Sequence, residues 1–273
     1  MSEKILIEDL RRDAKMRVDT DRILSPLWIL LPLIGITVAI VTAAFTAATF
    51  AFYRWERWAT GPQFPRWEGE FPFTMPAWIG GFFALGAVGV VAMILYAYLI
   101  YSLVKRRNGH FYREWMLVED LISMVRSVAS RKEREVEVPL SSVRRTLRDM
   151  RMSEAEKNPV LWVILLFVPG ASIIASLYIL YFLTVDFYRH ERREDGLLED
   201  LGKAMAIIET PISIRRTKPI PERSYILYLI LTIVTLGIFG IYWLYTLIVD
   251  PNNHFQEHIN LEDTIIDQLA TTI

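Results

Sequence analysis

Three stretches of the chain align with one another without a gap and decide how it is organised. Residues 94–121 read ILYAYLIYSLVKRRNGHFYREWMLVEDL, residues 174–201 read IASLYILYFLTVDFYRHERREDGLLEDL, and residues 238–265 read IFGIYWLYTLIVDPNNHFQEHINLEDTI. A pattern that recurs in the same register indicates internal repeats. The shared pattern is Y-x-x-Y-x-L-x6-H, and its tyrosines and histidines are Tyr98, Tyr101 and His110; Tyr178, Tyr181 and His190; and Tyr242, Tyr245 and His254.

Each repeated stretch begins inside a long apolar segment. Residues 23–53, 76–104, 160–185 and 225–249 contain no Asp, Glu, Lys, Arg or His. Each segment reaches the roughly 20 apolar residues that cross a bilayer. The chain of 273 residues is 53% hydrophobic and 22% charged, with a mean hydropathy of +0.28, which is more apolar than an ordinary globular protein. The sequence therefore predicts an all-α integral membrane protein in contact with the lipid bilayer.

The repeats predict an architecture of three units, each an apolar helical hairpin followed by a cytoplasmic amphipathic helix. We expect a polar elbow at each repeat histidine, between the hairpin and the amphipathic helix. Leu117, Leu121 and Val125 show the apolar stripe of that helix in the first unit. The predicted parts are an N-terminal segment 1–22, unit 1 at 23–130 with two spanning helices and a surface helix, a basic linker helix 131–158, unit 2 at 159–210, a linker 211–223, and unit 3 at 224–273 with an acidic tail.

The distribution of basic residues predicts the orientation. Lys and Arg are frequent before residue 23 and between residues 105 and 157, and they are scarce in the loop 54–75. Cytoplasmic segments carry the excess of positive charge. We therefore expect a multi-pass protein of the cytoplasmic membrane with a cytoplasmic N-terminus and an external loop 54–75. The tail after Asp250 has no Lys or Arg, so its side stays open.

Units 2 and 3 have two interpretations. A break at Pro169-Gly170 leaves a first arm of about 14 Å, and a break at Thr235-Leu236-Gly237 leaves two arms of about 18 Å, all too short to cross. Short re-entrant hairpins fit these lengths, although a turn within the bilayer must have its backbone groups satisfied by protein. The alternative is that each unit forms one span, with unit 2 inverted relative to unit 1.

A motif in unit 3 resembles a known family. Residues Thr235–Tyr245 read TLGIFGIYWLY and are followed by Asp250 and Asn252. This stretch is similar to the T-x-G-I-Y-G-I-Y-W-x-Y core, with a nearby D-x-N, of the prokaryotic membrane domain-of-unknown-function family 4234. Phe239 replaces a tyrosine of that core. The resemblance implies a multi-pass prokaryotic membrane protein and assigns no activity.

The repeat positions are the first candidate site. Asp186 and His190, like Asp250 and His254, stand four residues apart and share a helix face. In the first unit Arg106 replaces the aspartate, and a cation is a poor neighbour for a metal ion. We therefore expect capped helix ends at the membrane interface rather than a metal site; the fourth histidine, His258, does not change this. The paired tyrosines fit a belt at the lipid headgroups.

Two further surfaces are candidates for binding. The external loop combines tryptophans and arginines that could form a partner or ligand site, namely Trp55, Trp58 and Trp67. The linker helix carries Arg144, Arg145, Arg148 and Arg151, which could contact anionic lipids. Alternatively, this helix is solvated and its charge is neutralised by Asp149 and Glu154.

The composition excludes several functions. The chain has no cysteine, which excludes disulfides and thiolate chemistry, and a net charge of −1 gives no field for nucleic acid. The sequence contains no catalytic signature such as GxSxG, HExxH or a Walker loop. Scarce Asn and Gln are a weak sign of a thermophilic source. We expect a non-enzymatic scaffold or interaction subunit without a cofactor, with a membrane-protein partner or a second copy; the alternative is a small channel or transporter subunit.

Overall fold

The structure is a computed structural model that describes residues 3–59, 75–212 and 216–272. Within these ranges every regular element is helical: α1 (Glu3–Lys15), α2 (Arg17–Thr20), the 3₁₀ helix η1 (Pro26–Ile29), α3 (Leu30–Ala59), α4 (Met75–Arg131), α5 (Glu137–Ser153), α6 (Pro159–Leu166), α7 (Ala171–Ile207), α8 (Tyr225–Val234) and α9 (Ile238–Ala270). The all-helical prediction is confirmed.

The chain forms two compact units, one of residues 27–99 and one of residues 1–26 and 100–273. In the compact unit of residues 27–99, α3 packs along the first part of α4, where the rings of Phe45 and Phe82 lie 4.7 Å apart. Among the described residues, three helical segments contain an apolar stretch long enough to cross a membrane, Pro26–Phe52, Gly80–Arg131 and Ala171–Ile207, and α8 is a shorter apolar helix. The predicted apolar helices that could span a membrane are therefore present.

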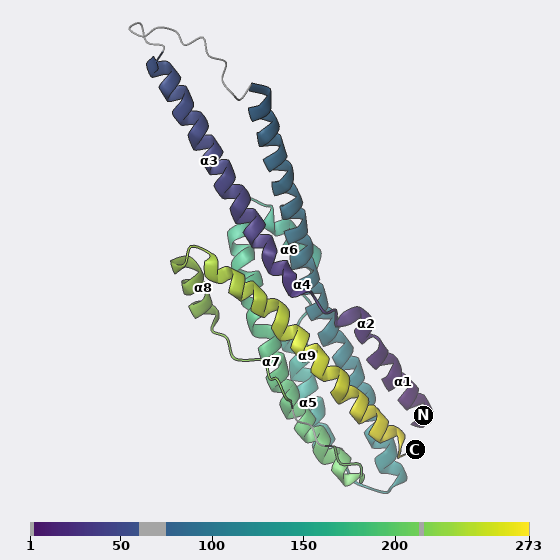
Figure 1. Ribbon diagram of the computed structural model, residues 1–273. Coiled ribbons are helices and arrows are strands. Elements are labelled where there is room, and N and C mark those ends of the chain that lie inside the picture. Colours follow the sequence, from purple (N-terminus) through teal and green to yellow (C-terminus); the bar gives the residue numbers. More distant parts are fainter. Residues whose placement is uncertain (1–2, 60–74, 213–215, 273) are drawn as a thin grey trace. The chain divides into compact units, whose positions relative to one another are not determined.

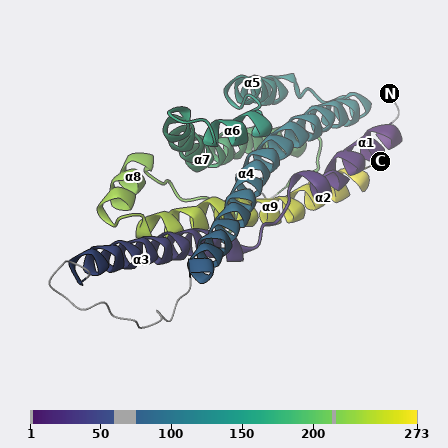
Figure 2. The ribbon, with the colours of Figure 1, turned by 90° about the horizontal axis from the view of Figure 1, so that it is seen from above.

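The compact unit of residues 1–26 and 100–273 is a helical bundle. It contains α4 from Ile100 onward, α5, α7 and α9, with α1 alongside α9 and α5 alongside α7 (Figure 1, Figure 2). The apolar stripes that the sequence predicts pack against each other here. The core they share includes Leu10, Leu117, Leu121, Leu197, Leu201, Ile265 and Leu269.

The helices differ from the sequence prediction at the repeat histidines. We expected a polar elbow at His110, His190 and His254, but α4, α7 and α9 continue through these positions without a break. The breaks lie earlier in the repeats: α6 and α7 are separated at residues 167–170, and α8 and α9 at residues 235–237. Gly170 and Gly237 adopt positive φ angles of 81° and 93° there, which suits glycine because it has no Cβ. Whether these hairpins re-enter the membrane stays a prediction.

A neighbouring arginine allows α9 to continue through Pro251. Proline has no backbone N–H, so the carbonyl of Leu247 loses the donor that it would have in a regular helix. The buried Arg106 side chain of α4 replaces that donor, because its Nη2 lies 2.7 Å from the Leu247 oxygen and its Nη1 lies 2.8 Å from Asn252 Oδ1. Arg106 therefore stabilises the part of α9 that carries His254.

We expect Arg106→Met to lower stability because it leaves the Leu247 carbonyl buried without a donor, at a cost of about 1–3 kcal/mol. The thermal midpoint of the detergent-solubilised protein, followed by circular dichroism, should fall by roughly 5 °C. Pro251→Ala restores the backbone N–H, so Arg106→Met should cost distinctly less in that background. An equal loss in both backgrounds would contradict the role assigned to Arg106.

A second prediction concerns Asp120 on α4, which lies near Asp9 and Asp13 of α1. Partial burial, followed by the charges of Asp13 and Asp9, raises the pKa of Asp120 to about 6. A carboxyl group with a raised pKa in the folded state destabilises that state once it ionises. The penalty is absent below the unfolded pKa of roughly 4 and complete above pH 6. Asp120→Asn should therefore raise the thermal midpoint at pH 8 and leave it unchanged near pH 4; the same gain at both pH values is the contrary result.

Candidate metal centre

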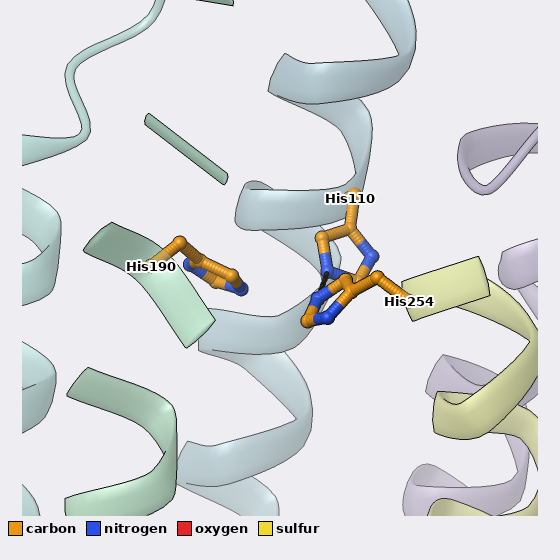
Figure 3. Close-up of side chains that lie close together, drawn as sticks. All are labelled: His110, His190 and His254. Carbon is orange, nitrogen blue, oxygen red and sulfur yellow. Dashed lines mark hydrogen bonds between the residues drawn. The ribbon is translucent and has the colours of Figure 1, made fainter. Parts of the chain in front are cut away.

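Three helices of the bundle bring six metal-binding side chains to one point. Each helix contributes residues four positions apart, which lie on one helix face. Figure 3 shows the imidazoles of His110, His190 and His254 close together, from α4, α7 and α9. All six side chains are buried, with at most 3% exposure. This six-donor cluster consists of His110 and Glu114, His190 and Glu194, and His254 and His258.

The donor atoms lie at the separations expected around a metal ion. Nε2 of His110 is 3.1 Å from Nε2 of His254, and Nε2 of His190 is 2.6 Å from Glu114 Oε2. Nε2 of His258 is 2.9 Å from Glu194 Oε1. Two longer separations join His110 Nε2 to Glu114 at 3.7 Å and His254 Nε2 to Glu194 at 3.9 Å. The imidazoles and the carboxylates therefore surround a common centre.

Each imidazole has a second carboxylate on its other nitrogen. The four Nδ1 atoms lie 2.9 to 3.2 Å from carboxylate oxygens, which leaves every Nε2 directed at the centre. Metal-bound histidines usually have this partner, because it fixes the tautomer and the ring orientation. The pairs are His110 with Asp21, His190 with Glu154, His254 with Glu191, and His258 with Glu262.

Arginines neutralise this outer ring of carboxylates. Arg113 lies 2.8 Å from Asp21 and 2.7 Å from Glu262, and Arg193 lies 3.2 Å from Glu154. Arg216 pairs with Glu194 and lies 3.9 Å from Glu191. Glu114 differs: no Lys or Arg of the described residues lies within 4.0 Å of it, and its Oε1 has no hydrogen-bond partner among them. A buried carboxylate in this position needs another positive charge.

Two histidines carry that charge when protons are the only cations at the site. Burial alone disfavours an imidazolium, but Glu114 and Glu154 together raise the pKa of His190 to about 10. In the same way Glu194 and Glu262 overcome burial and raise the pKa of His258 to about 10. Burial, with the charges of His258 and His190, lowers the pKa of His110 to about 3, and burial, with the charge of His258, lowers the pKa of His254 well below its usual value.

The cavity that adjoins the inner donors of the cluster is small. A cavity of about 20 Å³ adjoins the cluster on the side of Glu114, Glu194 and His258 and is otherwise lined mainly by leucines and isoleucines. This volume holds about one water molecule. The cluster therefore offers a set of donors that could hold an ion.

The structure separates the repeat aspartates from the repeat histidines. Asp186 pairs with Arg107 at 2.7 Å, and Asp250 pairs with Arg223 at 2.6 Å, so neither contacts the histidine four residues later. Arg106 points to the carbonyl of Leu247, so it does not contribute a positive charge to the cluster as the sequence argument assumed. The histidines themselves are fully buried, whereas we expected interfacial helix ends.

The repeat tyrosines do not take part in the cluster. Tyr98, Tyr178, Tyr242 and Tyr245 are exposed by 39% or more of their surface, whereas Tyr101 and Tyr181 are half-buried. The headgroup-belt interpretation stays a prediction. Trp55 and Trp58, at the end of α3, are also exposed, and Trp67 lies outside the described residues.

The arginines of α5 have partners that the sequence argument did not foresee. Arg144 pairs with Glu137, and Arg151 lies 2.8 Å from Glu119, whereas Arg145 and Arg148 are exposed. Glu154 does not neutralise this helix, because it is buried against His190 and Arg193. Contact of α5 with anionic lipids stays a prediction.

Sequence reasoning missed half of the cluster, although the signal was present. The ungapped alignment places Glu114, Glu194 and His258 at one shared position, four residues after the repeat histidines. All three residue types bind metal ions. The outer partners Asp21 and Glu154 lie outside the repeats, and no spacing in the sequence points to them.

Comparison with known proteins gives a family match and no function. No curated protein and no solved structure matches the chain. One family model matches residues 223–266, which comprise the end of the 211–223 linker, α8 and most of α9 with His254, His258 and Glu262. The family is described as Domain of unknown function (DUF4234), and the match confirms the resemblance seen in the sequence.

Proposed function

We propose that the protein is a non-enzymatic membrane scaffold whose helical bundle is held together by a divalent transition-metal ion. The observation that carries the proposal is the orientation of all four histidines of the chain: each directs Nε2 at one buried centre and has Nδ1 against a carboxylate. Imidazole and carboxylate donors suit first-row divalent ions.

The contact between His110 and His254 supports an ion rather than a proton network. Their Nε2 atoms are 3.1 Å apart, and burial lowers the pKa of both imidazoles, which favours their neutral forms. If Nδ1 of each donates to its carboxylate, two lone pairs face each other; if one proton moves to Nε2, a lone pair faces a carboxylate instead. A cation at the centre removes this conflict.

A scaffold role is supported by what surrounds the ion. The cluster joins α4, α7 and α9, and Asp21 and Glu154 tie the N-terminal segment and the end of α5 to it. An ion held in this way stabilises the packing of five chain segments, and the cavity beside the inner donors holds only about one water molecule. The exposed Arg145 and Arg148 of α5 are the proposed contacts to anionic lipids.

Metal binding should raise the stability of the full-length protein. After treatment with EDTA, the detergent-solubilised protein is mixed with MnCl₂, FeSO₄ under argon, CoCl₂, NiCl₂ or ZnCl₂, each alone. An ion at about 100 times its Kd stabilises the folded state by about 2.7 kcal/mol, so we expect the thermal midpoint to rise by about 5–10 °C with at least one ion.

Variants with matched chemistry test whether the cluster holds the ion. Glu191→Gln removes the carboxylate behind His254 and should weaken binding about 10- to 100-fold, as loss of such a partner usually does. Glu199→Gln, on the exposed face of the same helix, should bind as the original protein does. No thermal shift with any ion and no metal retained after gel filtration would show that the cluster is a proton-filled network and would contradict the proposal.

The alternative of a channel or transporter subunit has its own test. We expect liposomes that contain the purified protein to release Co²⁺, K⁺ and small solutes no faster than empty liposomes. Selective passage of any of these through the protein alone would reject the scaffold proposal and leave the ion-binding site in place.

A further inference from the structure

We infer that the cluster binds one divalent ion in a six-coordinate, octahedral geometry, with four nitrogen and two oxygen donors. This inference rests on the proposed ion-binding function and specifies which ions the site takes. Its basis is the arrangement of six donors on three helices, each of which supplies a pair at positions i and i+4.

The six donors lie near one another in a regular arrangement. They form four groups of three within which the ligand atoms lie no more than 4.8 Å apart, and each residue occurs in two groups. Any two groups share one residue, which is the relation between alternate faces of an octahedron. The groups are His110, His190 and His254; His110, Glu114 and His258; Glu194, His254 and His258; and Glu114, His190 and Glu194.

An octahedron with these four groups as alternate faces assigns the opposite corners. They are His110 with Glu194, His190 with His258, and His254 with Glu114. Each pair joins a repeat histidine to a donor on a different helix, and that donor stands four residues after the repeat histidine of its own helix. Three roughly parallel helices therefore supply two triangles of donors that are rotated relative to each other, which is the trigonal antiprism of an octahedral complex.

The size of the cluster agrees with a single six-coordinate ion. Donors about 2.1 Å from a metal ion lie about 3 Å from their neighbours in an octahedron. Five of the neighbour separations lie between 2.6 and 3.9 Å and include 2.9 and 3.1 Å, and within each group none exceeds 4.8 Å. A single ion fits with small side-chain movements.

The charges around the centre also suit a divalent ion. Arg113 and Arg193 accompany the outer carboxylates Asp21, Glu262 and Glu154, whereas Arg216 pairs with the inner Glu194, so Glu114 is the inner carboxylate without an arginine. Two carboxylates and four neutral imidazoles are donors that suit one dication. Structural Zn²⁺ is almost always four-coordinate, whereas Mn²⁺, Fe²⁺, Co²⁺ and Ni²⁺ accept six donors. The site therefore favours this second group of ions.

Cobalt is the probe that tests the geometry. The full-length protein is loaded with CoCl₂ alone, and its cobalt content, visible absorption and cobalt K-edge absorption are measured. We expect one Co²⁺ per chain, the weak pink absorption of six-coordinate cobalt, and about six nitrogen or oxygen neighbours with the multiple scattering of several imidazoles.

The outcomes that would overturn the octahedral geometry differ from the outcome that would contradict metal binding. Cobalt bound with the intense blue absorption of four-coordinate Co²⁺ overturns the inference and leaves the proposed function intact. Two ions per chain with a metal–metal distance of about 3.5–4 Å also overturns it, because that is a two-metal site. Absence of bound cobalt together with absence of every other tested ion contradicts the proposed function itself.

Variants confirm the source of the donors. Glu114→Ala removes one inner oxygen, so the visible absorption should intensify and the number of neighbours should fall by one, with Co²⁺ affinity reduced more than tenfold. Glu199→Gln should leave the spectrum unchanged. An unchanged spectrum in Glu114→Ala, with helix content preserved by circular dichroism, overturns the six-donor assignment.

Discussion

The bundle depends on the burial of six titratable side chains around one point. Charged and polar groups are stable in a protein interior only when they are paired, and the six donors of α4, α7 and α9 are paired with one another, with an outer ring of carboxylates, and with arginines beyond it. Because each layer needs the next, the positions of the N-terminal segment, of the end of α5 and of the linker before α8 all follow from the centre.

This dependence explains why α1 and α2 belong to the bundle. Asp21, directly after α2, contacts both His110 and Arg113. Gly109 allows the chain to approach there, since a Cβ at this position would lie 3.2 Å from the Thr20 side chain. The N-terminal segment therefore packs against α4 next to the cluster, and its apolar residues Leu6 and Leu10 join the common core.

The sequence alone reveals the apolar helices, the breaks near Gly170 and Gly237 and the repeat histidines, because length, glycine and periodicity are local signals. It does not reveal that the helices continue past the histidines, since the donor that replaces the N–H of Pro251 comes from Arg106 on another helix. It also does not reveal Asp21 and Glu154 as histidine partners, because contacts between distant segments leave no spacing to read. The alignment places Glu114, Glu194 and His258 at one shared position, but it does not show that α4, α7 and α9 pack together and bring these side chains to one point.

The third repeat departs from the other two at one position, where His258 stands in place of Glu114 and Glu194. Three glutamates there would give the inner donors a charge of −3 and favour an ion in the trivalent state. With two glutamates and one histidine these three side chains carry −2, so an ion bound as proposed would be stabilised less in a trivalent state than at a site with three glutamates. The departure of the third repeat would therefore suit an ion that keeps one oxidation state and stabilises the bundle.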